Sequence, residues 1–175
     1  AQQDDLLTGL LQLNWQEQTA LQLNSLLKAL EQRALAQRPP AQWLPRRAQI
    51  DALLDVSDPV CAWRAIAHWR AHDDAVLAKA AQTLAEGCPL TAHLVWQQIA
   101  RARYLSLGQV LQMEYAMSLN ACRHGEFSEG VRARLIDKDQ APHWHWQDVA
   151  HVPQAVVEAH FSKAWVGRHP LADLV

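Results

Sequence analysis

Three histidines, His143, His145 and His151, lie close together near the C-terminal end of the chain. Imidazole is a common metal ligand, but a tetrahedral site needs three or four ligands whose orientation is fixed by neighbouring groups. His143 and His145 alternate with Trp144 and Trp146, and no acidic ligand is fixed beside them. We therefore expect these histidines to be solvated or to cap helices, and we predict no metal site.

The possible nucleophiles are few. Cys61, Cys88 and Cys122 are far apart and include no Cys-X-X-Cys pair, which disfavours a disulfide framework or a structural zinc site and favours buried free thiols. Cys122 precedes Arg123 and His124, which are neighbours that can activate a thiol. At the end of an apolar helix, however, a buried thiol is the commoner outcome. No serine lies in a nucleophile elbow, so no Ser-His-Asp or Cys-His arrangement is expected.

Two arginines flank Ala133 and are expected to have a structural role. Glu114 lies on an otherwise apolar helix face, where a carboxylate is costly unless it is partnered. We therefore predict that Glu114 is not fully exposed, and that it pairs with Arg132 or Arg134.

The elements that must position these side chains are helices. Apolar residues recur at helical spacing nearly everywhere, and strand-like alternation is rare. Helices are expected over about 6–13, 16–36, 46–54, 57–69, 73–84, 89–99, 106–124, 127–135 and 153–164. Local signals mark their ends: N-caps at Ser57 and Asp73, a Gly87 stop before a Pro89 start, and a Ser106–Gln109 capping box.

These patterns predict an all-α fold, an irregular bundle of about eight helices. Residues 1–45 are expected to form an N-terminal helical arm that ends in a proline-containing linker, 36–45. Residues 46–175 are expected to form a helical C-terminal domain that holds the main core. The arm could be a separate unit, or it could wrap a partner.

Composition excludes several classes of protein. Apolar residues make up 50% of the chain and the net charge is −2, which is typical of a globular protein and disfavours nucleic-acid binding or a membrane-surface patch. The apolar runs are too short to span a bilayer. There are 8 tryptophans. Those on helical apolar faces are expected in the core (Trp63, Trp69, Trp96), and those near ends and loops at a docking surface (Trp15, Trp43, Trp144, Trp146).

The segment EFSEGVRARLIDKDQAPHW, residues 126–144, resembles the C-terminal signature of the 3-hydroxyisobutyryl-CoA hydrolase group within the enoyl-CoA hydratase/isomerase (crotonase) superfamily. AEGCPLTAHLVWQQI, LSLGQVLQMEYAMSLNACRHGEF and EAHFSKAW are similar to neighbouring segments of that family. The resemblance covers about 75–165. Residues 1–71 agree with the family only in helical character.

The resemblance implies the helical C-terminal part of an acyl-CoA hydrolase. Thioester hydrolysis needs N–H donors aimed at the thioester oxygen and a carboxylate that acts as nucleophile or base. In the family both come from an N-terminal half whose motifs have no counterpart here. We therefore expect no catalytic residue in this chain, no cofactor beyond the CoA thioester substrate, and no activity of the chain alone.

Lys138 is the one residue that the resemblance places near ligand. In related crotonases a basic residue on the corresponding helix approaches the CoA phosphates, and a lysine is a suitable point-charge partner for phosphate. The alternative is a surface lysine paired with Asp137 or Asp139.

The function implied is cleavage of a short branched hydroxyacyl-CoA in valine breakdown, with the chain acting beside an N-terminal crotonase-fold half. Free thiols are typical of a reducing compartment, and we expect the protein in the cytoplasm. A homo-oligomer is possible. Two alternatives are a non-catalytic helical interaction module and a small subunit that pairs with a catalytic subunit. The parent reaction could also be that of a hydratase or an isomerase, because one scaffold serves several reactions.

Overall fold

The computed structural model describes residues 2–174, and within them it contains helices and no strand. The prediction of an all-α fold is confirmed, with nine α-helices in this described part. They are α1 (Gln2–Leu11), α2 (Thr19–Ala34), α3 (Arg47–Leu54), α4 (Pro59–Ala67), α5 (Ala75–Glu86), α6 (Pro89–Ala102), α7 (Leu107–Arg123), α8 (Glu126–Val131) and α9 (Gln154–His160). The chain divides into two compact units, one up to Arg47 and one from Ala48 onwards.

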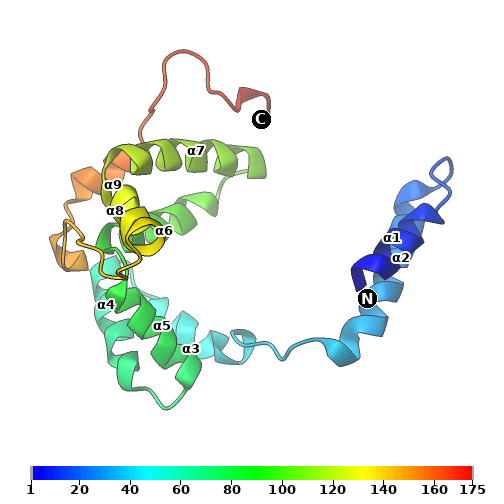
Figure 1. The fold of residues 1–175 in the computed structure, drawn as a ribbon, viewed down its shortest axis with the longest axis horizontal. Helices are drawn as coiled ribbons and strands as arrows, with labels where there is room; N and C mark the ends of the chain where they lie inside the picture. Colours follow the sequence, from blue (N-terminus) through cyan, green and yellow to red (C-terminus); the bar gives the residue numbers. More distant parts are fainter. Residues whose placement is uncertain (1, 175) are drawn as a thin grey trace. The chain divides into compact units, whose positions relative to one another are not determined.

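The first unit is a hairpin of α1 and α2 (Figure 1). The two helices approach closely at Gly9, where an added Cβ would lie 2.5 Å from Leu26 Cδ1. Gln22 orders the connecting turn, since its amide accepts from Asn14 N at 3.1 Å and donates to Glu17 O at 2.7 Å. No residue of α2 is buried, so two helices alone do not complete a core.

Helix starts in the second unit follow the capping rules, with two corrections. The N-cap of α4 is Asp58 rather than Ser57, and that of α5 is Asp74 rather than Asp73. Each aspartate accepts from the backbone N–H two residues ahead, at 3.0 and 2.9 Å. Of two adjacent polar residues, the one whose side chain makes this hydrogen bond is the N-cap. The predicted capping box of Ser106 with Gln109 is confirmed at the start of α7.

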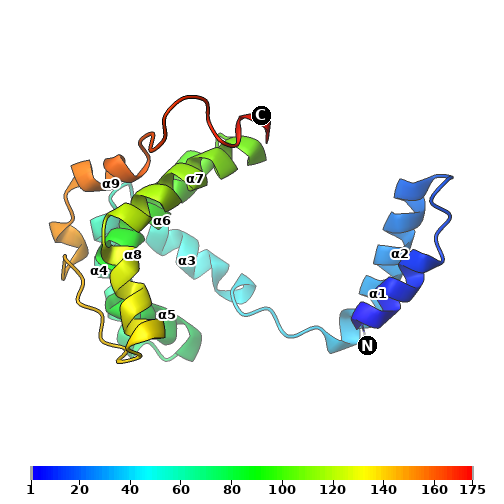
Figure 2. The same cartoon turned by 45° about the horizontal axis from the view of Figure 1, so that its top comes forward.

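The core of the second unit joins α6, the segment before α9 and α9 itself. Leu90, Leu94, Val152 and Val157 form its buried cluster, with Trp146 packed against it. Trp146 therefore belongs to the core rather than to the loop surface expected for it. α7 contacts both α8 and α9, and the three helices lie close together in Figure 2.

Asn120 and the C-terminal segment complete the packing around α7. The buried Asn120 amide donates to the carbonyls of Ala159, His160 and Ser162 at 3.1, 3.1 and 3.0 Å. The chain beyond α9 then follows α7, where the Gln112 amide donates to Leu171 O at 2.9 Å. The last helix is shorter than expected and ends at His160.

A glycine and a change of helical type shape the turn into α8. Gly125 has φ 84°, a left-handed conformation that side chains disfavour, and it lets the chain reverse from α7 into α8. Beyond Val131 the helix continues as a π-helical turn, Arg132–Ile136. Among the described residues, no helix is long and apolar enough to cross a membrane.

Candidate functional site

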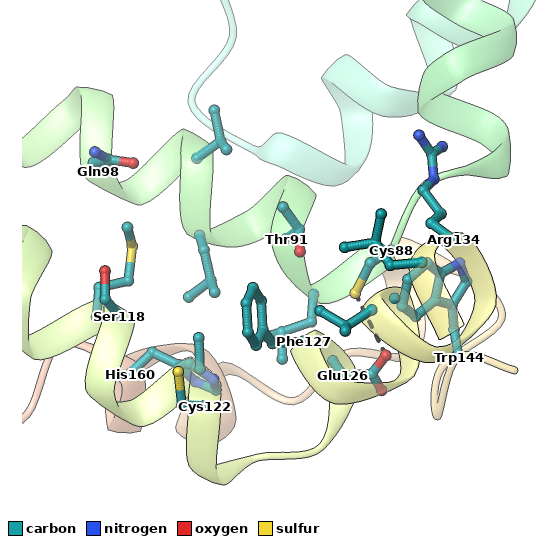
Figure 3. Close-up of a pocket in the computed structure, with 18 residues that line it drawn as sticks. Cys88, Thr91, Gln98, Ser118, Cys122, Glu126, Phe127, Arg134, Trp144 and His160 are labelled. Atoms are coloured by element: carbon teal, nitrogen blue, oxygen red, sulfur yellow. Dashed lines mark hydrogen bonds between the residues drawn. The ribbon is translucent and has the colours of Figure 1, made fainter. Parts of the chain in front are cut away.

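An apolar groove of about 630 Å³ opens between α6, α7 and α8 (Figure 3). Phe127 lies in the middle of the groove, and Val131 and Leu135, which follow it at four-residue spacing, also line it. Phe127 and Leu135 remain 56% and 68% exposed, so the apolar face of α8 meets an open groove rather than a closed core. The lining of the groove also includes Leu94, Val95, Met117, Ala121 and Trp144.

The polar atoms at the α8 end of the groove are already engaged. Glu126 accepts from the Cys88 thiol at 3.5 Å and from His145 N at 2.8 Å. Burial raises the pKa of the Cys88 thiol, and the negative charge of Glu126 raises it further. A thiol held in its protonated form is a poor nucleophile, so Cys88 with Glu126 is suited to packing rather than to covalent chemistry.

The exposure of the other cysteines corrects a prediction. Cys61 and Cys122 are exposed rather than buried, and Cys122 lines the groove. The Cys61 thiol donates to Asp58 at 3.2 Å, and this hydrogen bond raises the pKa of the thiol. Sequence patterning missed this exposure because it assumed that the apolar faces of α4 and α7 were fully covered.

Arg132 binds three carboxylates. It donates two parallel bonds to Glu129, at 2.9 and 2.7 Å, and its Nη1 lies 2.6 Å from Oδ2 of Asp137 and of Asp139. Its Nη2 also donates to Ala141 O at 3.1 Å. These bonds raise the pKa of the guanidinium and lower the pKa of Glu129 to about 2. Arg132 therefore fixes the loop that follows the π-helical turn.

Glu114 has a different partner from the predicted one. It is half-buried, as expected for a carboxylate on an apolar face, but it accepts from the Gln98 amide at 2.6 Å across the α6–α7 contact. The prediction of a pair with Arg132 or Arg134 is therefore wrong. Arg132 lies beside nearer carboxylates, and Arg134 is exposed on the lining of the groove.

Lys138 lies at the end of the Arg132 loop. It is exposed and has φ 57°, a left-handed conformation between the two aspartates. Lys138 is not paired with Asp137 or Asp139 in the structure, and both carboxylates bind Arg132 instead. Within the described part of the chain Lys138 forms no ion pair, and its contact with CoA stays a prediction.

The histidines contribute their backbone to this region. His143 N donates to Glu129 at 2.6 Å, which ties the loop after Pro142 back to α8. Trp144 packs over Gly130, where an added Cβ would lie 3.2 Å from its ring, and its Nε1 donates to Glu86 O at 3.4 Å. Over residues 2–174, no cluster of three or more His, Cys, Asp or Glu side chains could hold a metal ion.

The second unit is thus a helical domain with an open apolar groove and a charged turn beside it. Similarity to known sequences extends this description to a family. The sequence profile described as enoyl-CoA hydratase/isomerase matches residues 1–161, and the chain belongs to that family. The match includes residues 1–71, where reasoning from the sequence found agreement in helical character alone.

Two curated relatives show how the similarity is distributed. The chain is 45% identical over 85 residues to a mitochondrial 3-hydroxyisobutyryl-CoA hydrolase of Danio rerio, which is 48% of this chain and 22% of the relative. It is 35% identical over 89 residues to small ribosomal subunit protein mS47 of Arabidopsis thaliana, which is 49% of this chain and 22% of the relative. The matched region thus spans about a fifth of the length of these relatives.

A solved structure supports the fold. The enoyl-CoA hydratase from Rhodobacter sphaeroides 2.4.1 superimposes with a TM-score of 0.62 at 26% identity. The similarity covers 79% of this chain and 42% of that one. Together with the relatives, this makes the chain a member of the enoyl-CoA hydratase/isomerase superfamily that resembles 3-hydroxyisobutyryl-CoA hydrolase.

Proposed function

We propose that the chain is the helical C-terminal part of a CoA-thioester hydrolase that acts on a short branched hydroxyacyl-CoA such as 3-hydroxyisobutyryl-CoA. The catalytic half of the crotonase fold would supply the oxyanion hole and the carboxylates. The observation that carries this proposal is the open groove between α6, α7 and α8, whose lining is apolar and whose Phe127 and Leu135 stay exposed. Such a surface is typical of a face that another part of the protein covers.

Two further features support a binding role for this chain and a catalytic role for the other half of the protein. The Cys88 thiol of the groove is held in its protonated form beside Glu126, which suits it to packing rather than to nucleophilic chemistry. Lys138 is exposed and forms no ion pair within residues 2–174, as a contact to CoA phosphates requires. In this proposal Lys138 contributes electrostatic binding and the groove contributes docking. The cytoplasmic location stays a prediction, and the Danio rerio relative is named as mitochondrial.

The first test is thioester hydrolysis by the 175-residue chain alone, followed as CoA release from 3-hydroxyisobutyryl-CoA. The protein thiols must be blocked beforehand, because exposed Cys61 and Cys122 would consume a thiol-reactive reporter. We expect no release above background, and activity when a catalytic half is added. Clear turnover by the chain alone would contradict the proposal that the catalytic groups lie in the other half of the crotonase fold.

A non-catalytic interaction module is the second candidate, and the similarity to a protein named as a ribosomal subunit favours it. A small subunit paired with a separate catalytic subunit is a variant of the same idea. The coding sequence upstream discriminates between these candidates, since a continuous frame with crotonase-like catalytic motifs supports one polypeptide.

The similarity to an enoyl-CoA hydratase keeps a hydratase or isomerase as the alternative parent reaction. Parallel assays with enoyl-CoA substrates test it.

A further inference from the structure

We propose that Arg132 is a positioning residue that keeps Lys138 available to the phosphates of a CoA thioester. The inference rests on the proposed CoA contact of Lys138. Its basis is the position of Asp137 and Asp139 on either side of Lys138. Arg132, and not Lys138, binds these two carboxylates.

Asp137 and Asp139 are the carboxylates adjacent to Lys138 in the sequence. Arg132 Nη1 lies 2.6 Å from an oxygen of each, so one guanidinium nitrogen holds both side chains. A carboxylate that accepts a charge-assisted hydrogen bond attracts a second cation less strongly than a free one. Without Arg132, the two aspartates on either side of Lys138 would lose the cation that binds them.

The backbone of the turn fixes this arrangement. Asp137 N donates to Arg132 O at 2.8 Å, and Gln140 N donates to Ala133 O at 3.1 Å. Lys138 and Gln140 both have φ 57°, which is the left-handed region, within this turn. Asp139 also accepts from Ala141 N at 2.9 Å, which holds its carboxylate in the turn beside Arg132.

Glu129 holds the guanidinium from the other side. Its two oxygens accept from Nε and Nη2 of Arg132, and this bidentate geometry restricts rotation of the guanidinium plane. Lysine at position 132 would keep the charge but could not reproduce the two parallel bonds together with the bonds to Asp137 and Asp139. The role therefore requires the guanidinium and not only a positive charge.

The test is the rate at which an acetylating reagent modifies Lys138 in the 175-residue chain, measured by mass spectrometry with exposed Lys79 as internal reference. A carboxylate that pairs with a lysine ammonium favours its protonated form. Because only the neutral amine reacts with the reagent, the ion pair slows acylation. We expect R132Q to slow the modification of Lys138 by about threefold, the effect of an exposed ion pair. The triple variant R132Q/D137N/D139N should restore the rate, which general damage to the fold would not do.

The double variant D137N/D139N keeps the test decisive if R132Q fails to fold. With Arg132 present, the two aspartates should have little effect on Lys138, so its modification rate should stay unchanged. A faster rate in D137N/D139N would show that Lys138 already pairs with these carboxylates and would overturn the proposal. An unchanged rate in well-folded R132Q would overturn it equally.

The CoA contact itself is tested separately in the complete enzyme. K138Q should raise the KM for the CoA thioester and leave kcat unchanged, and R132Q should do the same through Lys138. If K138Q leaves KM unchanged, the proposed CoA contact fails, and the role given to Arg132 fails with it. If only R132Q leaves KM unchanged, the CoA contact stands and the role of Arg132 is overturned.

Discussion

The Arg132 guanidinium and the Glu129 carboxylate are joined by two parallel hydrogen bonds, Nε to Oε2 at 2.9 Å and Nη2 to Oε1 at 2.7 Å. The same Oε1 accepts from His143 N at 2.6 Å, so one carboxylate connects α8, the π-helical turn and the following loop. Its charged form is the one that all three donors stabilise. The motif that identifies the family is therefore also an ion-pair network that closes a turn.

The pH dependence of stability should reflect this network. The pKa of Glu129 is lowered from 4.5 to about 2, mainly by the bonds from Arg132 and then by the bond from His143 N. A carboxyl whose pKa is lower in the folded state stabilises the protein above its ordinary pKa, and this stabilisation is lost as the pH falls from about 4.5 towards 2. We expect Glu129→Gln to be less stable than the parent at pH 7 and to lose less stability between pH 5 and 3.

Urea unfolding followed by tryptophan fluorescence at several pH values measures this effect. Asp55→Asn is the matched control, because Asp55 is an exposed carboxylate with no hydrogen bond or ion pair within residues 2–174. A Glu129→Gln curve parallel to that of the parent protein would contradict the prediction.

His160 should control stability at higher pH. Its side chain is 1% exposed, and burial lowers its pKa below 6.5, an effect that the nearby His124 ring increases. The bond between Nδ1 and Val156 O, 2.8 Å, acts in the opposite direction. The neutral imidazole is favoured in the folded state, so its stabilisation is complete above pH 6.5 and is lost as the pH falls below that value.

Replacing His160 with Gln should remove the loss of unfolding free energy between pH 7 and 5. The Glu129 effect lies at lower pH, so the two can be separated in one titration. An unchanged slope over this range in His160→Gln would show that another group is responsible.

Asn120 should be essential to the packing of α9 on α7. Its amide donates to three carbonyls at the end of α9, and the side chain is 6% exposed. Asn120→Ala removes this donor from the carbonyls of His160 and Ser162, whereas Ala159 O keeps its bonds from Ser162, and we expect a loss of about 1–3 kcal/mol in the free energy of unfolding. Ser118→Ala, an exposed change on the same helix, should have little effect in the same urea titration.

The open groove predicts the behaviour of the isolated chain. We expect the protein to bind an apolar fluorescent dye and to self-associate, because exposed Phe127 and Leu135 border an apolar cavity. Phe127→Glu should lower dye fluorescence by at least about twofold and shift the protein towards monomer in light scattering. Leu107→Glu changes an exposed leucine outside the groove and is the control. Equal effects of the two variants would exclude the groove as the cause.

Local signals in the sequence were enough to predict the helices and several of their ends. The Ser106–Gln109 box and the Gly87–Pro89 junction were predicted because the hydrogen bonds and dihedral limits behind them involve residues within one helical turn. The signature at 126–144 likewise indicates the family without any tertiary contact.

What the sequence determined was therefore local: helical character, caps and a recognisable motif. The tertiary structure decided which groups meet, as with Glu114 and Gln98, 16 residues apart, and which apolar faces stay open, as at Phe127. Choosing between Gln98 and an arginine as the partner of Glu114 depends on how α6 and α7 pack. The physical reason is that capping and helical periodicity are short-range, whereas burial and ion-pair partners depend on the packing of distant segments.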